Sequence, residues 1–359
     1  MKATIDAVVH VLALIAGRER EAAVDDLCAH SILSRPMASW ALTSAIAAFD
    51  ATTMQVIAEK RAYANESVAV LLAASVATAP LRAVLLPILS AASRVCVRVT
   101  ARDEPFAQRI VRACGRVTPS LPPVVLSTAP GRAFVRQVAT SDAARLVAFG
   151  RDETYRQLAA EVAPHVMLEF RGHGHGVAVV DEADAWTDRH ALALARDVAA
   201  YEQSGCLSPQ CVFVRATEIA HWVAGFAAAL DSVSVELPVG PVDRATAALV
   251  HAWRGALAAA DADLRIGRAG SIAVTRGLPA IASPGARNVP VVPYANEFEL
   301  RDLLAPIASA TTTVGVSGPH AARTLSQSLQ YARVVPVGAM QTPPLDGWED
   351  PRPPRIRPR

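Results

Sequence analysis

Short, continuous apolar runs alternate with runs of helical periodicity along most of this chain, and this alternation limits the folds open to it. The first apolar run, Ser67 to Ala74, lacks the every-second-residue polarity of a half-exposed strand, so we predict a strand buried on both faces. The same order of strand and helix then recurs, with predicted strands RVCVRV, PPVVLS, RLVAFG and HVMLEF. Repeated β-α units of this kind predict a mostly parallel, doubly wound α/β sheet, which binds ligands at the carboxyl ends of its strands.

A second α/β region follows a glycine-rich segment at residues 172–176. Here we predict strands over 177–180 and 211–214, separated by a helix over 186–200. Residues 261–285 carry glycines and prolines, and we expect them to be irregular. The expected organisation has four parts: a helical segment over 1–62, a dinucleotide-binding domain over 63–174, a catalytic α/β domain over 175–335, and a C-terminal segment and tail over 336–359.

Composition narrows the class of protein without assigning a function. The chain has 359 residues, of which 52% are hydrophobic, and this is enough for two α/β domains. A net charge of +2 gives no general attraction to nucleic acid. The N-terminal apolar run is interrupted by Asp6 and His10, so we predict an amphipathic helix instead of a signal peptide, and we expect no membrane span. The final stretch, PRPPRIRPR, is expected to be a loose tail.

The five cysteines are scattered, without the paired spacing of a zinc site or a redox motif. We therefore expect free thiols in a reducing, cytoplasmic setting. His173 and His175 lie two residues apart, but no third ligand stands nearby, so no metal is expected.

Cys206 differs from the other cysteines because small and polar residues surround it, between a predicted helix and a predicted strand. A thiol at such a junction has room to face a cleft and to accept an acyl group, which makes Cys206 a candidate nucleophile. The alternative is an inert, buried cysteine. Cys211, inside the apolar strand that follows, is assigned to that alternative.

The stretches RVCVRVTARDEP, VAFGRDET, MLEFRGHGHGVAVV and EQSGCLSPQ, in this order, resemble the aldehyde dehydrogenase superfamily and, more narrowly, the LuxC-type fatty acyl-CoA reductases. The closing stretch RVVPVGAMQTPPLDGWED is similar to the same family. The resemblance runs from about Ser67 to Asp350 and implies an aldehyde dehydrogenase-like fold, with two Rossmann-like domains and the active site between them. The family's cysteine loop is matched here by Gln203, Cys206, Ser208, Pro209 and Gln210.

The resemblance implies reduction of an acyl-CoA, expected to be fatty, to an aldehyde through an acyl-enzyme on Cys206. The backbone N–H of Cys206 is a candidate oxyanion donor. An acyl-protein is an alternative substrate, and a homo-oligomer is implied. Glu169 lies where the superfamily has Leu-Glu-Leu-Gly-Gly and is a candidate general base or positioning group, although Arg171 replaces the first glycine. The alternative for Glu169 is a structural carboxylate at a strand end.

The cofactor residues also come from the resemblance, because the chain has no G-x-G-x-x-G fingerprint. Ala101 and Arg102 stand where NAD-preferring members place an acid, so NADPH is the expected cofactor, with NADH as the alternative because Asp103 is close. The candidate cofactor-binding residues are Arg98, Thr100, Arg102, Gly150, Asp152 and Thr154.

Departures from the family pattern leave two other functions open. Ser75 or Thr78 falls where the superfamily has an oxyanion-binding asparagine, and no asparagine is present there. One alternative is a different thiol-dependent aldehyde dehydrogenase, which oxidises an aldehyde. The other is a non-catalytic relative that keeps the fold as a binding module or scaffold. Consumption of NADPH with an acyl-CoA would indicate the reductase, and absence of an acyl adduct on Cys206 would indicate the scaffold.

Overall fold

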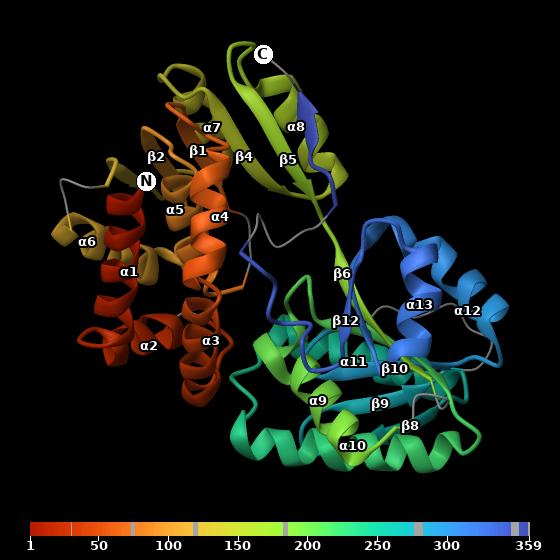
Figure 1. Ribbon diagram of the computed structural model, residues 1–359. Coiled ribbons are helices and arrows are strands. Elements are labelled where there is room, and N and C mark those ends of the chain that lie inside the picture. The colour runs from red at the N-terminus through yellow and green to blue at the C-terminus, as the bar shows by residue number, and fades with distance from the viewer. Residues whose placement is uncertain are drawn as a thin grey trace. The chain divides into compact units, whose positions relative to one another are not determined.

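The computed structural model describes residues 1–29, 31–72, 76–117, 121–181, 186–275, 283–345 and 352–357 (Figure 1). The chain divides into two compact units, each of which is described by itself. Unit 1 comprises Met1–Ser31, Ala38–His173 and Pro344–Arg359, and unit 2 comprises Ile32–Met37 and Gly174–Pro343. The expected helical segment over 1–62 thus falls mainly in unit 1, and the expected C-terminal segment over 336–359 is shared between the units.

Unit 1 is built on a six-stranded sheet with the order β13-β5-β4-β1-β2-β3. All neighbouring pairs are parallel except β13 with β5, and the order reverses between β1 and β4, as in a doubly wound sheet. The strands are β1 (Ser67–Leu71), β2 (Arg94–Arg98), β3 (Val124–Ser127), β4 (Arg145–Gly150), β5 (Met167–Gly172) and β13 (Arg355–Arg357).

Helices cover both faces of this sheet, which explains its continuous apolar strands. Ala69 of β1 belongs to one core cluster with Phe134 and Leu158, from helices that follow β3 and β4. Its neighbours Val68 and Val70 point to the opposite face and are also fully buried. Helix α1 packs against α5 and α6. The helices assigned wholly or mainly to unit 1 are α1 (Lys2–Ala16), α2 (Arg20–Ala29), α3 (Arg35–Ala47), α4 (Ala51–Lys60), α5 (Ala79–Leu89), α6 (Glu104–Val117), α7 (Gly131–Ala139) and α8 (Asp152–Glu161).

Unit 2 repeats this architecture with a seven-stranded sheet in the order β12-β11-β6-β7-β10-β9-β8. Only the pairing of β8 with β9 is antiparallel among these neighbours. Its strands are β6 (His175–Asp181), β7 (Pro209–Arg215), β8 (Asp263–Ile266), β9 (Ser271–Val274), β10 (Asn288–Pro293), β11 (Thr311–Val316) and β12 (Arg333–Pro336). Its helices are α9 (Asp188–Ala199), η2 (Ala200–Gln203), α10 (Ile219–Glu236), α11 (Arg244–Ala259), α12 (Glu297–Leu304), η3 (Ala305–Ala310) and α13 (Pro319–Ser328).

The predicted fold class, mostly parallel and doubly wound α/β, is confirmed by these two sheets. The prediction that residues 261–285 are irregular is wrong for residues 263–274, where β8 and β9 lie, and residues 276–282 of this range lie outside the described residues. Two of the glycines that suggested irregularity form the turn between β8 and β9, where Gly267 N–H donates to Gly270 O at 2.9 Å. Gly270 is needed for close approach, since a Cβ there would lie 1.9 Å from the carbonyl oxygen of Arg287.

The prediction of a loose C-terminal tail is also wrong for residues 352–357. Strand β13 pairs antiparallel with β5 and forms this edge of the sheet. The Arg357 guanidinium donates to carbonyl oxygens at the end of α8, at 2.7 Å to Ala159, 2.7 Å to Val162 and 3.0 Å to Ala163. Arg352 Nη2 donates to Gly172 O at 2.9 Å. The arginines that suggested a solvated tail therefore fix it to strand and helix ends far away in the sequence.

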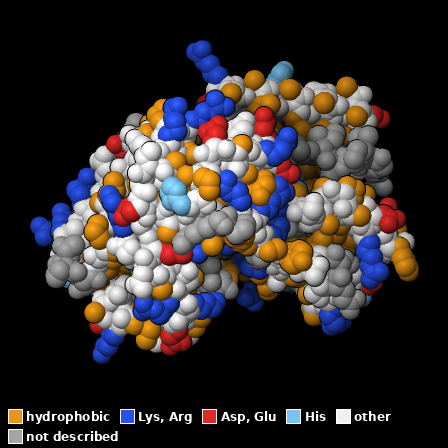
Figure 2. All heavy atoms as spheres, turned by 90° about the horizontal axis from the view of Figure 1, so that it is seen from above, with side chains coloured by type: hydrophobic (Ala, Val, Ile, Leu, Met, Phe, Trp, Pro, Cys, Tyr) orange, Lys and Arg blue, Asp and Glu red, His pale blue; other side chains and the backbone are white. Residues whose placement is uncertain are grey.

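Charged side chains of both signs are interspersed with apolar ones on the face shown in Figure 2, in keeping with the small net charge. Among the described residues, no single helix has the length and apolar character needed to cross a membrane. The pair α3 and α4, bent by 56°, passes such a test together by length and composition only.

Candidate active site

The loop that carries Cys206 begins with an unusual backbone. Three consecutive residues after α9, Tyr201, Glu202 and Gln203, have positive φ angles of 53°, 54° and 60°. For residues with a Cβ, each left-handed conformation costs about 1–2 kcal/mol. Such a turn persists only when contacts from elsewhere hold it in place.

A buried ion pair supplies the main contact. Arg287 is completely buried, and its Nε and Nη2 atoms lie 2.8 and 2.7 Å from the two carboxylate oxygens of Glu202. Its Nη1 donates to Ser234 Oγ at 2.8 Å, and the Gly240 N–H donates to Glu202 at 3.1 Å. Burial raises the pKa of Glu202, while the Arg287 charge opposes that rise.

The backbone joins the same two turns. Ala286 N–H donates to Glu202 O at 3.0 Å, and Ala286 and Arg287 themselves have φ angles of 50° and 60°. Two left-handed turns, one before Cys206 and one before β10, are therefore held against each other by one ion pair and one backbone hydrogen bond.

Two glutamines close the loop around the cysteine. Gln203 Nε2 donates to Pro209 O at 2.8 Å, and Gln210 Nε2 donates back to Gln203 O at 2.8 Å. The Cys206 carbonyl oxygen accepts from Thr312 Oγ1 at 2.9 Å. On the other side, a Cβ on Gly176 would lie 2.4 Å from Leu207 O, so only glycine permits this approach.

These anchors place Cys206 at the amino ends of β6, β7 and β11, which begin at His175, Pro209 and Thr311. Cys206 is partly buried, whereas Cys211 lies inside β7. Burial raises the pKa of the Cys211 thiol to about 12, so this thiol stays protonated and inert at neutral pH. Partial exposure is one condition for a reactive thiol, which Cys206 fulfils and the buried Cys211 does not.

A second set of contacts ties the segment after β12 to the cysteine loop. Gln341 Nε2 donates to Ser208 Oγ at 3.1 Å and to Asp197 O at 3.0 Å. The Asp197 carboxylate accepts from the backbone N–H groups of Gly338 and Met340, at 2.5 and 3.2 Å. Burial raises the pKa of Asp197 to about 7 despite these donors.

The candidate cofactor residues of unit 1 gather at the carboxyl edge of its sheet. At the end of β2, Arg98 donates to Leu72 O at 3.0 Å and to Ala129 O at 3.1 Å, so it joins the segments that follow β1 and β3. Thr100 Oγ1 donates to Asp103 at 2.7 Å, and Arg102 Nε lies 2.9 Å from the other oxygen of this buried carboxylate.

At the end of β4, Gly150 lies against the first turn of α8. A Cβ on Gly150 would come within 3.0 Å of the Thr154 side chain, so the strand and helix approach closely here. Asp152 is the first residue of α8 and pairs with Arg355 at 2.9 Å on the surface. The structure thus brings the ends of β2 and β4 to one edge of a single sheet.

Glu169 lies within β5 and is already engaged. Its carboxylate accepts from Arg171 at 2.9 Å, from Arg145 at 3.3 Å and from Tyr63 OH at 3.4 Å. Thr78 is buried at the residue before α5, and Ser75 lies outside the described residues.

Sequence reasoning selected Cys206 and its loop but missed Glu202, Arg287, Asp197 and Thr312. A charged residue next to Gln203 in an otherwise apolar and small-residue setting was a signal for Glu202. Nothing in the spacing points to Arg287, which is distant in sequence.

Among solved structures, this chain is similar to aldehyde dehydrogenases. Aldehyde dehydrogenase 21 from Physcomitrella patens, solved with the reaction product succinate, matches with a TM-score of 0.70 and 15% identity, over 94% of this chain and 77% of that one. HpcC from Thermus thermophilus matches with a TM-score of 0.72 and 16% identity, over 94% and 74%. The NADP-dependent glyceraldehyde-3-phosphate dehydrogenase from Bacillus halodurans, complexed with NADP, matches with a TM-score of 0.68 and 14% identity, over 92% of this chain and 77% of that one. The fold is that of an aldehyde dehydrogenase.

The family is narrower than this fold. The model of the acyl-CoA reductase (LuxC) family matches residues 49–348, and the chain belongs to that family. Its activity is the reduction of an acyl-CoA to an aldehyde, as the sequence predicts. A comparison with curated proteins finds no match.

We expect Arg287→Met to destabilise the protein by about 3–5 kcal/mol, because it leaves the Glu202 carboxylate buried without its partner. Replacing both residues, with Glu202→Leu and Arg287→Met together, should cost clearly less than the single change. Urea unfolding of both variants measures this. Arg196→Met, which breaks an exposed ion pair with Glu236, is the control and should stay within about 0.5 kcal/mol of the unchanged protein. Equal losses in the single and double variants would contradict the assignment.

The raised pKa of Asp197 predicts that the free energy of unfolding depends on pH. Its folded pKa of about 7 lies above its ordinary value of 3.8, so between these values the folded chain binds the extra proton. Stability should therefore fall as the pH rises from about 4 to 7, by up to about 1.4 kcal/mol per pH unit. Urea unfolding at several pH values, compared with Asp197→Asn, isolates this contribution. A wild-type slope that matches that of the variant would refute it.

Proposed function

We propose that the chain reduces a fatty acyl-CoA through an acyl-enzyme on Cys206, with NADPH as the reductant. The Cys206 thiolate attacks the thioester carbonyl, and a bond from Sγ to the acyl carbon forms. The bond from that carbon to the CoA sulfur then breaks, and CoA leaves as a thiolate that takes up a proton. A thioester is thus exchanged for a thioester of similar energy, and the acyl group awaits reduction.

The observation that carries this proposal is the anchoring of the cysteine loop. Contacts from Gln203, Gln210 and Thr312 fix the backbone on both sides of Cys206, while Cys206 stays partly exposed. Such an arrangement holds a nucleophile in one orientation and supports the backbone N–H of Cys206 as a donor to the oxyanion.

The carboxyl edge of the unit 1 sheet suits a dinucleotide. It lies at the reversal of strand order between β1 and β4, where doubly wound sheets bind nucleotides, and Gly150 allows the tight turn into α8. Arg98 and Thr100 would support the loops around the adenosine, and the first turn of α8, Asp152 to Thr154, would face the phosphates with backbone N–H groups. When bound, the reduced nicotinamide supplies the hydride that turns the acyl group into an aldehyde.

Arg102 supports NADPH over NADH. Its guanidinium already pairs with Asp103, so the charge of this carboxylate is neutralised, and one third of the Arg102 side chain remains exposed. A 2′-phosphate would meet a cation here instead of the free carboxylate that favours a 2′-hydroxyl.

Glu169 has a supporting role in this proposal. Hydride reduction of a thioester needs no base to activate water, and the carboxylate already accepts from Arg145 and Arg171. We assign Glu169 to holding β5 and its neighbours in place.

Acylation can be tested by mass spectrometry of the protein incubated with dodecanoyl-CoA and no reductant. We expect the mass of one acyl group on the Cys206 peptide, and its loss after NADPH is added. Cys206→Ala should carry no adduct, and Cys211→Ala, the control, should carry the same adduct as the unchanged protein because its thiol is buried and inert. Absence of an adduct on the unchanged protein would favour the scaffold alternative.

For the cofactor, Arg102→Ala should lower kcat/KM for NADPH by about tenfold, because one charge-assisted contact to the 2′-phosphate is lost. The value for NADH should change less than twofold. Steady-state rates with each cofactor measure the two effects. A loss of equal size with both cofactors would show that Arg102 acts on the fold and not on the 2′-phosphate.

A further inference from the structure

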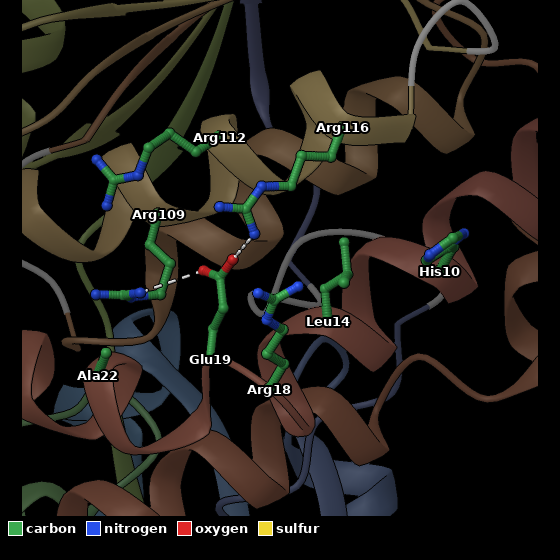
Figure 3. Close-up of a pocket in the computed structure, with 8 residues that line it drawn as sticks. All are labelled: His10, Leu14, Arg18, Glu19, Ala22, Arg109, Arg112 and Arg116. Carbon is green, nitrogen blue, oxygen red and sulfur yellow. Dashed lines mark hydrogen bonds and ion pairs between the residues drawn. The ribbon is translucent and has the colours of Figure 1, made fainter.

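A basic pocket of about 570 Å³ lies in unit 1 between α1, the start of α2 and α6. Figure 3 shows the guanidinium groups of Arg18, Arg109 and Arg116 gathered around the Glu19 carboxylate, with Arg112 on the adjoining turn of α6. Four arginines thus line one hollow, whose only carboxylate among the described lining residues is Glu19.

The arginines of α6 share one face of the helix. Arg109, Arg112 and Arg116 follow each other at intervals of three and four residues, which places like charges side by side and is unfavourable unless anions compensate them. The protein's own compensation is partial. Glu19 pairs with Arg109 at 3.2 Å and with Arg116, and Asp26 pairs with Arg109 at 2.5 Å.

Two of the four arginine side chains that line the pocket have no ion-pair partner among the described residues. Arg18 and Arg112 are exposed, and neither makes an ion pair or a side-chain hydrogen bond within the described part of the chain. Four guanidinium groups against two carboxylates leave an excess of two positive charges. A ligand with a single negative charge would not balance this excess of positive charge.

This pocket is separate from the proposed dinucleotide site. Helix α6 begins at Glu104, just after the carboxyl end of β2, and Arg109, Arg112 and Arg116 lie further along it. A helix that follows a parallel strand runs back toward the amino edge of the sheet. The pocket therefore lies away from the edge at which the nicotinamide dinucleotide is expected.

We propose that this pocket binds a small ligand that carries two or more adjacent phosphate groups. Planar guanidinium groups donate paired hydrogen bonds to phosphate oxygens, and Arg18 and Arg112 are the groups that remain for this role. The volume lies within the range of small-molecule sites and exceeds what one phosphate needs. The phosphates belong either to a free polyphosphate or nucleotide, or to CoA.

Calorimetric titration of the full-length protein with inorganic pyrophosphate tests the site directly. We expect saturable binding, weakened about tenfold by Arg112→Ala and by Arg18→Ala, since each removes one charge-assisted donor. The control is Arg136→Ala, an exposed arginine of α7 outside the pocket, which should bind like the unchanged protein. Thermal unfolding of each variant checks that the fold is kept.

Parallel titrations with ATP and CoA identify the source of the phosphates. The site takes CoA phosphates if CoA binds more tightly than pyrophosphate and Arg112→Ala weakens both. It takes a free polyphosphate if ATP and pyrophosphate bind alike and the part of CoA binding that Arg112→Ala removes is smaller. No pyrophosphate binding at millimolar concentration, or equal binding by the unchanged protein and Arg112→Ala, would overturn the proposal. None of these measurements depends on Cys206 or on turnover.

Discussion

The buried ion pair of Glu202 and Arg287 is the interaction on which the arrangement around Cys206 depends. A buried ion pair adds little net stability compared with a well-packed apolar pair, because both charges lose their hydration. Its effect here is on geometry. A left-handed run of three residues with side chains is costly, and the two hydrogen bonds from Arg287 give Glu202, in the middle of it, a directional contact that holds it in place. The ion pair therefore fixes a single conformation of the loop, and the protein is less stable than it would be with a well-packed apolar pair in its place.

The cysteine-loop pattern takes on a physical meaning in this structure. Gln203 and Gln210 do not reach outward but donate to backbone carbonyl oxygens at opposite ends of the loop, and Ser208 accepts from Gln341. The residues that match the family's cysteine loop are therefore those that hold the backbone around Cys206. The Met-Gln pair near the C-terminus, which appeared in the sequence as a separate motif, belongs to the same assembly through Gln341.

The sequence predicted what depends on local pattern and missed what depends on distant partners. Continuous apolar runs located the central strands of both sheets, since burial on both faces leaves a clear signal. Strands β8 and β13 escaped because they lie at sheet edges, where short, exposed and charged segments resemble loops. The buried strand β9 escaped as well, because it has only four residues and follows the glycine-containing turn after β8. Glu202 and Arg287 are 85 residues apart, and their pairing follows only from the fold that brings β7 and β10 together.

Arginine side chains satisfy carbonyl oxygens at several strand and helix ends of unit 1. Arg98 joins the segments after β1 and β3, Arg357 holds the end of α8, and Arg352 reaches the last residue of β5.

Arg171, which departs from the superfamily's glycine, has a similar role, since it donates both to Glu169 and to Arg352 O. Its side chain compensates a buried carboxylate and fixes the returning tail, so the departure is accommodated by partners that a glycine could not hold. The pocket between α1 and α6 differs in this respect, because Arg18 and Arg112 have no carbonyl or carboxylate partner among the described residues.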